Sequence, residues 1–444
     1  GVTEDGSILA AYNHEQSEDG LYHLVRHPRA RQDSGAIIEL SNGLTIPQTN
    51  ITIGWMTLEN QLNRGDEVSV GVNSHQVALA GWVSLEDDRN MRARDADPLV
   101  EDGATLEILQ VALQRARSAR EGVEIIGDLY NRYGIASANG IAIADKKEIW
   151  YMETGGGRHW AAIRIPNDAL WIQATAYRIG QIDPNNRDVM VSPDLLEFAT
   201  RHDLYNPERE MFDFAEAFGG RATKNSEYQP VSNMRIWRAI NLLNPKLQVH
   251  PNQLEYPQWI RPEDKISLQN LITVLRDQYQ DIHPDSLAHD SLNLARANIA
   301  SQKTTYSTVI QLTNGLPASV GAVLWTGLGS SVTTPYIPFY FGINEIPKPF
   351  DKDTPDKQKA YRFFRRLSDL YYNNPGKYAD LFPAVWDDFQ NRAVREQVEI
   401  DQGAMRLNRM DSRMSRHFLT VNVEALGQQA IDIATRKLEE ADEY

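Results

Sequence analysis

Cysteine is absent from the 444 residues, and so are long apolar runs. The missing thiols exclude disulfides, thiolate metal sites and a cysteine nucleophile within these residues. No stretch approaches the ~18 apolar residues that a transmembrane helix needs. Basic residues are also in deficit, with 45 Lys and Arg against 60 Asp and Glu and a net charge of -15. Because such a surface repels phosphates and anionic lipid, we expect neither nucleic acid nor a membrane as a partner.

Local signatures of metal or phosphate chemistry are missing as well. The ten histidines form no His-Glu-x-x-His pattern, and no acidic calcium loop is present. There is no Gly-x-Ser-x-Gly elbow for a serine nucleophile. The glycines at 155–157 stand between two predicted strands, which indicates a hairpin turn rather than a phosphate loop opening a helix. We therefore expect no metal site and no phosphate-binding loop.

The pattern of apolar residues predicts strands and helices in blocks. Residues 105–133 repeat apolar side chains at helical spacing and predict two helices broken near Ser118. Short apolar runs bounded by turn residues predict strands at 7–12, 36–40, 51–55, 68–73, 77–82, 140–145, 148–153, 159–164, 169–174, 306–312 and 320–326.

This order of elements favours an α+β fold in layers over alternating βαβ units. Residues from about 192 to 290 are polar and helical in pattern, and about 355–442 predict a helical tail. No linker, repeat or low-complexity segment interrupts the chain. We therefore expect a single domain over 1–444, with 192–290 as a helical insertion.

Several motifs, in order along nearly the whole chain, are similar to one family. They include the residues at 3–7, 71–73, 97–99, 116–121, 140–145, 150–155, 164–168, 178–180, 192–195, 321–325, 361–367 and 386–389. Together they resemble the cysteine dipeptidases of the dipeptidase A family, in the N-terminal-nucleophile hydrolase superfamily. The resemblance implies an αββα sandwich of two antiparallel sheets between helical layers. It also implies dipeptide hydrolysis by an N-terminal cysteine whose own α-amino group is the base, with no cofactor.

The catalytic positions implied by the resemblance are altered at the start of the chain. The cysteine would lie a short way upstream of Gly1. The family's Ala-Arg-Asn-Glu-Asp segment corresponds to 11–15, which keeps Asn13 but has Tyr12 and Glu15 where an arginine and an aspartate would orient the nucleophile and the amine.

Three further positions follow from the same resemblance. Asn73 is kept from an Asn-Glu-x-Gly segment, while Thr175 stands where an asparagine would supply an oxyanion-hole amide. Lys303 replaces an arginine in an Arg-Thr-x-Glu-Ser-His pattern. We expect the site where the 12–15 strand end meets Asn73, Thr175 and 303–306, and an ion pair between Lys303 and Glu15.

Two functional interpretations stay open. A thiolate needs a nearby cation or base, and the loss of one oxyanion donor typically costs about 10²–10³ in rate. Either a nucleophile upstream of Gly1 works with a rebuilt site, giving weak or altered amide hydrolysis, or the chain is a non-catalytic scaffold, binding or assembly protein. A dipeptide or other small amide is the expected ligand, a homo-oligomer is compatible with the sequence, and both the cytoplasm and export are open.

Overall fold

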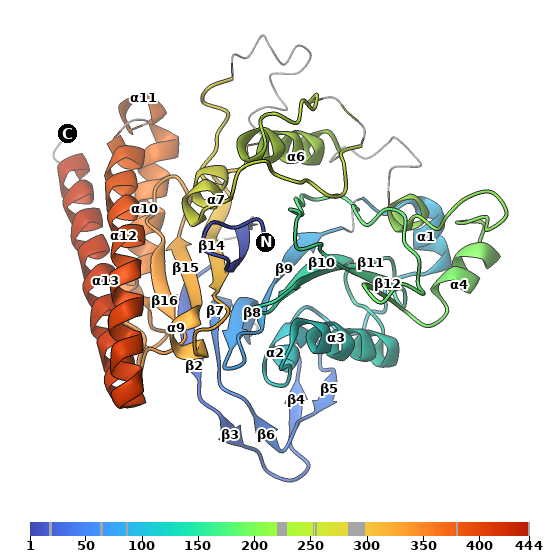
Figure 1. Ribbon diagram of the computed structural model, residues 1–444, viewed down its shortest axis with the longest axis horizontal. Helices are drawn as coiled ribbons and strands as arrows, with labels where there is room; N and C mark the ends of the chain where they lie inside the picture. Colours follow the sequence, from blue (N-terminus) through green and yellow to red (C-terminus); the bar gives the residue numbers. More distant parts are fainter. Residues whose placement is uncertain are drawn as a thin grey trace.

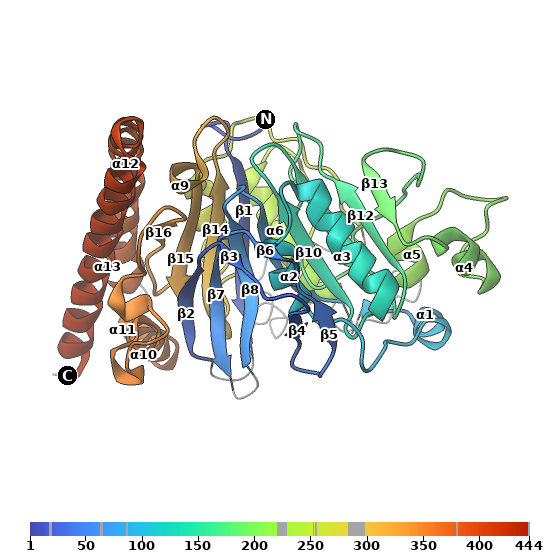
Figure 2. The ribbon, with the colours of Figure 1, turned by 90° about the horizontal axis from the view of Figure 1, so that it is seen from below.

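The computed structural model describes residues 1–16, 20–62, 65–85, 88–219, 229–251, 253, 255–282, 298–378 and 381–442. Two antiparallel sheets form its centre (Figures 1 and 2). The smaller sheet has the order β1-β14-β15-β16, with β1 at Ile8–Glu15, β14 at Thr304–Leu312, β15 at Ala322–Leu328 and β16 at Ile337–Tyr340.

The larger sheet contains eight strands in the order β13-β12-β11-β10-β9-β8-β7-β2. They are β2 (Tyr22–His27), β7 (Trp55–Leu62), β8 (Gly65–Asn73), β9 (Ala78–Ser84), β10 (Asn139–Ala144), β11 (Ile149–Thr154), β12 (Trp160–Arg164) and β13 (Val189–Val191). Two short ribbons lie beside it: β3 (Ala30–Arg31) with β6 (Ile51–Thr52), and β4 (Ile37–Glu39) with β5 (Thr45–Pro47).

Helices cover the outer faces of both sheets. On the larger sheet, α2 (Ile108–Leu113) and α3 (Ala119–Tyr133) enclose a core with side chains of β9 to β12. On the smaller sheet, α10 (Ala360–Asn373) packs against β15 and α13 (Ser412–Asp442) against β16. Another buried cluster includes Met56 of β7 with Leu324 and Trp325, which point to opposite faces of β15, so this cluster fills the space between the sheets and continues under the C-terminal helices. The αββα sandwich expected from the resemblance and the helical tail predicted from the pattern of residues 355–442 are therefore confirmed.

The remaining helices connect or flank these layers. They are α1 (Met91–Ala96), α4 (Leu195–Arg201), α5 (Phe214–Phe218), α6 (Gln229–Leu243), α7 (Leu268–Leu275), α9 (Ala318–Gly321), η4 (Lys348–Phe350), η5 (Asp356–Gln358), α11 (Pro375–Tyr378) and α12 (Leu381–Met410). Parts of the expected helical insertion, 220–228 and 283–290, lie outside the described residues. None of the described helices combines the length and the apolar character that crossing a bilayer requires.

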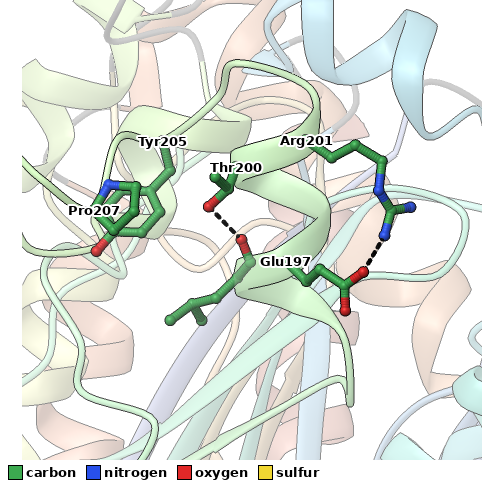
Figure 3. A pocket seen from close by; sticks show the side chains of 6 residues that line it. Glu197, Thr200, Arg201, Tyr205 and Pro207 are labelled. Atoms are coloured by element: carbon green, nitrogen blue, oxygen red, sulfur yellow. Dashed lines mark hydrogen bonds and ion pairs between the residues drawn. The ribbon is translucent and has the colours of Figure 1, made fainter.

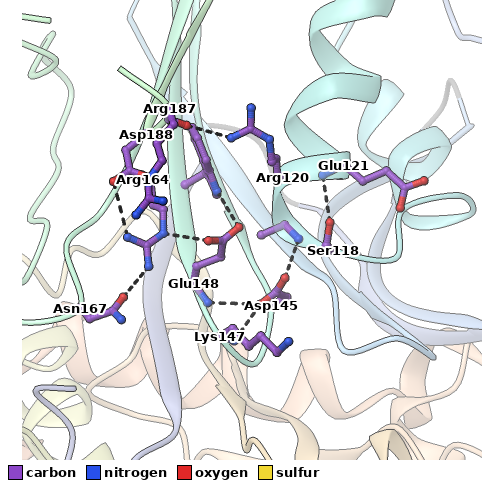
Figure 4. A network of polar contacts seen from close by, with 12 residues as sticks. Ser118, Arg120, Glu121, Asp145, Lys147, Glu148, Arg164, Asn167, Arg187 and Asp188 are labelled. Carbon is purple, nitrogen blue, oxygen red and sulfur yellow. Dashed lines mark hydrogen bonds and ion pairs between the residues drawn. The ribbon is translucent and has the colours of Figure 1, made fainter. Parts of the chain in front are cut away.

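The predicted break near Ser118 is confirmed, and side chains define the start of α3. The Ser118 hydroxyl accepts a hydrogen bond from the backbone N–H of Glu121, as an N-cap residue does. Asp145, in the β10–β11 turn, accepts from the N–H of Ala119 at 2.8 Å and from those of Lys147 and Glu148 (Figure 4). One carboxylate thus joins the helix to the hairpin below it.

The strand predicted at 169–174 is wrong. Only Leu170 pairs there, in an isolated bridge to Ile260. The apolar side chains that suggested a strand instead pack sideways: Trp171 lies against Tyr151, and Ile172 joins a cluster with α6. These residues are apolar because they are buried between a sheet and a helix. A short apolar run does not by itself distinguish such a buried loop from a strand.

A buried polar network attaches α12 to the smaller sheet. Gln311 of β14 donates to Asp5 and accepts from Gln397 of α12. Next to it, the Tyr340 hydroxyl donates to Asp401 of α12 at 2.7 Å. Burial, with a smaller contribution from the charge of Asp5, raises the pKa of Asp401 to about 6.

We expect Asp145→Ala to lower the free energy of unfolding by about 1–2 kcal/mol, since three backbone N–H groups lose their acceptor. Urea unfolding measures the change. Asp183→Ala, which removes an acceptor from an exposed turn, is the matched control. Equal losses for the two variants would contradict the role of Asp145.

The Asp401 carboxyl keeps its proton in the folded chain at pH values where the unfolded chain has already lost it. Stability should therefore fall as the pH rises from about 4 to about 6, by on the order of 2 kcal/mol. Asp401→Asn should remove that decline, measured by urea unfolding at several pH values, whereas Asp388→Asn on the exposed side of α12 should keep it. A decline that persists unchanged in Asp401→Asn would refute this assignment.

Candidate active site

The end of β1 places alternate side chains on opposite sides of the smaller sheet. Tyr12 and His14 face the larger sheet, where His14 lies edge-on to Tyr22 of β2. Asn13 faces the other way, toward α7, because its amide donates to the carbonyl oxygens of Leu275 and Ile299, both at 2.8 Å. Residues 12–15 therefore contribute side chains both to the interface between the two sheets and to the helical side of the smaller sheet.

Glu15 forms an ion pair with Arg235 of α6, with 2.9 Å between the carboxylate and the guanidinium. The two side chains are 29% and 19% exposed, so the pair is partly screened from water yet reachable from solvent. The Glu15 charge also contributes to raising the pKa of Tyr372, for which burial is the main cause. The structure therefore places opposite charges side by side at the end of the first strand.

The predicted ion pair between Lys303 and Glu15 is not formed among the described residues. A register shift after His14 pairs Glu15 with Thr304, and the Lys303 carbonyl accepts the N–H of Gln16 at 3.1 Å. The backbones are therefore adjacent, as expected, but the Lys303 side chain is exposed while Glu15 turns to Arg235.

The Asn13 side chain forms three hydrogen bonds within the protein. Besides its two amide hydrogen bonds, its carbonyl oxygen accepts from the Ser307 hydroxyl of β14. These contacts hold β1 against the segments after α7 and before β14. The structure therefore gives Asn13 a positioning role at the strand end.

Asn73 lies toward the opposite end of β1. Its amide donates to the carbonyl oxygens of Leu113 and Ala116 at the end of α2, and its own carbonyl accepts two N–H groups of the following turn. Gln76 of that turn donates to Leu316, beyond the end of β14 that pairs with Ile8. Asn73 is thus not brought together with residues 12–15.

Thr175 lies on the side of the site where α6 also lies. It is half-buried in the loop between β12 and β13. The preceding Ile172 and Ala174 pack against Ile236 and Ile240 of α6, the helix that carries Arg235. Of the positions implied by the resemblance, the structure therefore gathers Tyr12, Glu15 and the Lys303 backbone at one strand end and adds Arg235, while Thr175 follows a segment that packs on the same helix as Arg235.

His14 is buried and neutral at physiological pH. Its ring stacks on Tyr306 at 4.8 Å, and its Nδ1 shares a hydrogen bond of 3.2 Å with the Tyr12 hydroxyl. Burial lowers the pKa of His14 to about 4, opposed by a hydrogen bond with Gln16. Tyr12, at the position where the resemblance implies an arginine, is thus tied to a neutral imidazole.

Aromatic side chains of the larger sheet and of the loop after β12 lie near Tyr12. The Tyr151 ring lies 5.0 Å from that of Trp171, and the Arg178 guanidinium lies over Trp171 at 5.7 Å. Burial raises the pKa of Tyr151, and Glu153 and Tyr12 add to the shift, so Tyr12 is close by. A Cβ at Gly140 would lie 1.9 Å from the Tyr151 hydroxyl, which explains a glycine on β10 there.

A separate hollow lies on α4 (Figure 3), outside this site. It is lined by Leu196, Glu197, Thr200, Arg201, Tyr205 and Pro207. None of these residues belongs to β1, to α6 or to the loop that carries Thr175. Among the described residues, no group of three His, Asp or Glu side chains is placed to hold a metal ion.

Two stacked sheets between helical layers, with charged groups gathered at the end of the first strand, define the αββα class that includes the N-terminal-nucleophile hydrolases. The model of Peptidase family C69 matches residues 2–387, and the chain belongs to that family.

Named relatives agree with this assignment. A probable dipeptidase of Salmonella dublin is 30% identical over 357 residues, covering 79% of this chain and 81% of its own. A probable dipeptidase of Latilactobacillus sakei is 29% identical over 392 residues, covering 85% and 80%. Among solved structures, a mutant of the conjugated bile acid hydrolase from Clostridium perfringens matches with a TM-score of 0.36 and 11% identity, covering 73% of this chain and 87% of that one.

Arg235 is the site residue that the sequence did not reveal. It lies 220 residues from Glu15 along the chain, on a helix whose pattern resembles many others. No local motif marks it, because only the packing of α6 over the strand end creates the contact.

We expect His14→Gln to flatten the acid limb of the stability profile. In the unfolded chain the imidazole takes a proton below pH 6.5, whereas in the folded chain it stays neutral to about pH 4, so stability falls as the pH drops through that window. Urea unfolding between pH 4 and 7 measures the slope, with the exposed His417→Gln as control. Parallel slopes for the native protein and His14→Gln would rule out this explanation.

Proposed function

We propose that this chain hydrolyses the amide bond of dipeptides at the end of β1, with a nucleophile carried by residues upstream of Gly1. Membership of Peptidase family C69 and relatives named as dipeptidases support the reaction class. The observation that carries the proposal to this end of the molecule is the partly exposed ion pair of Glu15 with Arg235.

The charges of this pair suit a dipeptide. A dipeptide at neutral pH carries an ammonium group at one end and a carboxylate at the other. Glu15 can pair with an ammonium, whether of the substrate or of an N-terminal nucleophile, and a guanidinium binds carboxylates through paired hydrogen bonds. When a dipeptide binds, the pair of Glu15 with Arg235 is replaced by two new pairs of opposite charge, so neither residue is left without a partner. We therefore assign the binding and orientation of the dipeptide to these two residues.

The cleavage itself proceeds in two steps, and Thr175 is the described group that we assign to it. The nucleophile gives up its proton as it adds to the amide carbon, the C–N bond breaks, and the leaving amine takes that proton. Water then cleaves the bond between the acyl group and the nucleophile, which frees the acid and restores the nucleophile. Thr175, beside α6, is the described side chain that we assign to the developing oxyanion, through its hydroxyl. Because a hydroxyl offers a single donor where the resemblance implies an amide, turnover should be slow.

The alternative is a protein that binds small amides without cleaving them. Tyr12 favours it, since a neutral phenol bonded to neutral His14 cannot stabilise a thiolate as a guanidinium can. Binding of dipeptides by the native protein, without release of amino acids, would establish this second function in place of the first.

The test is hydrolysis of a dipeptide panel by the complete protein, including the residues that precede Gly1. We expect Arg235→Gln to lower kcat/KM by about 100-fold and Arg235→Lys to restore part of it, because the charge returns without the paired geometry. Arg201→Gln, which breaks an exposed pair with Glu197 on α4, is the matched control and should leave kcat/KM unchanged. Full activity in Arg235→Gln would defeat the proposal.

A further inference from the structure

Helices α12 and α13 form an antiparallel hairpin on the outside of the molecule (Figures 1 and 2). Both views show it as the outermost layer, and no other described element covers its outer side. The match to the C69 family model ends at residue 387, so nearly all of this hairpin lies beyond it. The outer side of the hairpin is therefore open to a partner.

The tip of the hairpin is basic in an acidic protein. Residues 404–418 hold four arginines against one aspartate, a net charge of +3, while the whole chain carries -15. The basic tip consists of Arg406, Arg409, Arg413 and Arg416, of which the first three are exposed. It also carries two exposed methionines, Met410 and Met414.

The opposite end of the hairpin is acidic. Residues 384–392 and 429–442 hold six acids against three cations, a net charge of -3. The exposed members of this acidic end are Asp388, Asp432, Glu439 and Glu440, whereas the Asp387 carboxylate is paired with Arg276 next to α7. The hairpin thus carries equal and opposite charges at its two ends.

Between the ends, exposed apolar side chains stand among exposed charges of both signs, Arg395 with Glu399 on α12 and Glu424 on α13. Val398 is 58% exposed and Val421 48%. Gly403 packs against Phe418, and Arg392 donates to Gln429, so Val398 and Val421 lie within about one helical turn of each other across the hairpin. Gln402 and Gln428 are exposed in the same part of the hairpin.

We infer that this side of the hairpin binds the same side of a second copy of the chain in antiparallel orientation. A two-fold axis near Val398 and Val421 places the basic tip of each copy on the acidic end of the other, which makes the surface self-complementary. A 30-residue helix is about 45 Å long and about 10 Å across, so two present about 900 Å². Stable interfaces bury about 800 Å² per partner. The inference does not depend on the proposed hydrolysis.

Light scattering on the complete protein at low salt tests the pairing. We expect twice the molar mass of one copy, falling to that of a single copy at high salt as the charges are screened. Arg406→Glu with Arg409→Glu reverses the tip, and Asp432→Lys with Glu439→Lys reverses the acidic end. Each double variant alone should dissociate with a Kd at least about tenfold higher.

Mixing the two double variants is the decisive arm. In a mixed dimer every reversed tip meets a reversed end, so an equimolar mixture should regain the dimeric mass although neither variant does alone. Arg187→Glu with Arg209→Glu, on exposed arginines elsewhere, is the matched control and should stay dimeric. Circular dichroism checks that all variants fold.

Three results would overturn the inference. They are a native protein that is monomeric at low salt, a tip-reversed variant that stays dimeric, and a mixture that stays monomeric. A native monomer that binds phosphatidylserine vesicles through its arginine tip would assign the surface to anionic lipid instead.

Discussion

The pairing of β1 with β14 is the constraint on which the rest of the structure depends. Its register sets Tyr12 and His14 toward the larger sheet and Asn13 and Glu15 toward the helices. A slip by one residue would exchange these faces, because successive side chains in a strand point to opposite sides. Asn13 holds the register from its side through carbonyl groups and Ser307, and the stacked rings of His14 and Tyr306 hold it from the other.

At the end of β1, neutral buried polar groups lie on one side of the sheet and charged groups on the other. On the sheet side, burial keeps His14 neutral beside the Tyr12 hydroxyl, and Tyr151 keeps its proton because burial raises its pKa. On the helical side, Glu15 and Arg235 remain charged and partly exposed. Because ionic groups attract charged ligands while neutral buried groups fix shape, recognition is assigned to the helical side and rigidity to the sheet side.

Local features were predictable from the sequence, whereas long-range contacts were not. The break before α3 could be read because Ser118 is an N-cap residue next to an apolar helical period. The segment 169–174 was misread because burial against a helix leaves the same apolar run as a strand. The Lys303–Glu15 pair failed for a related reason: the backbone adjacency was right, but α6, far along the chain, offered Glu15 a better placed cation.

The proposed site requires that Glu15 and Arg235 act as one unit in binding and cleaving an amide. A double-mutant cycle on dipeptide hydrolysis measures this directly, with Glu15→Gln, Arg235→Gln and both changes together. The account predicts that the double variant loses little more than either single one, a coupling of about 1–3 kcal/mol. Losses that simply add would contradict it.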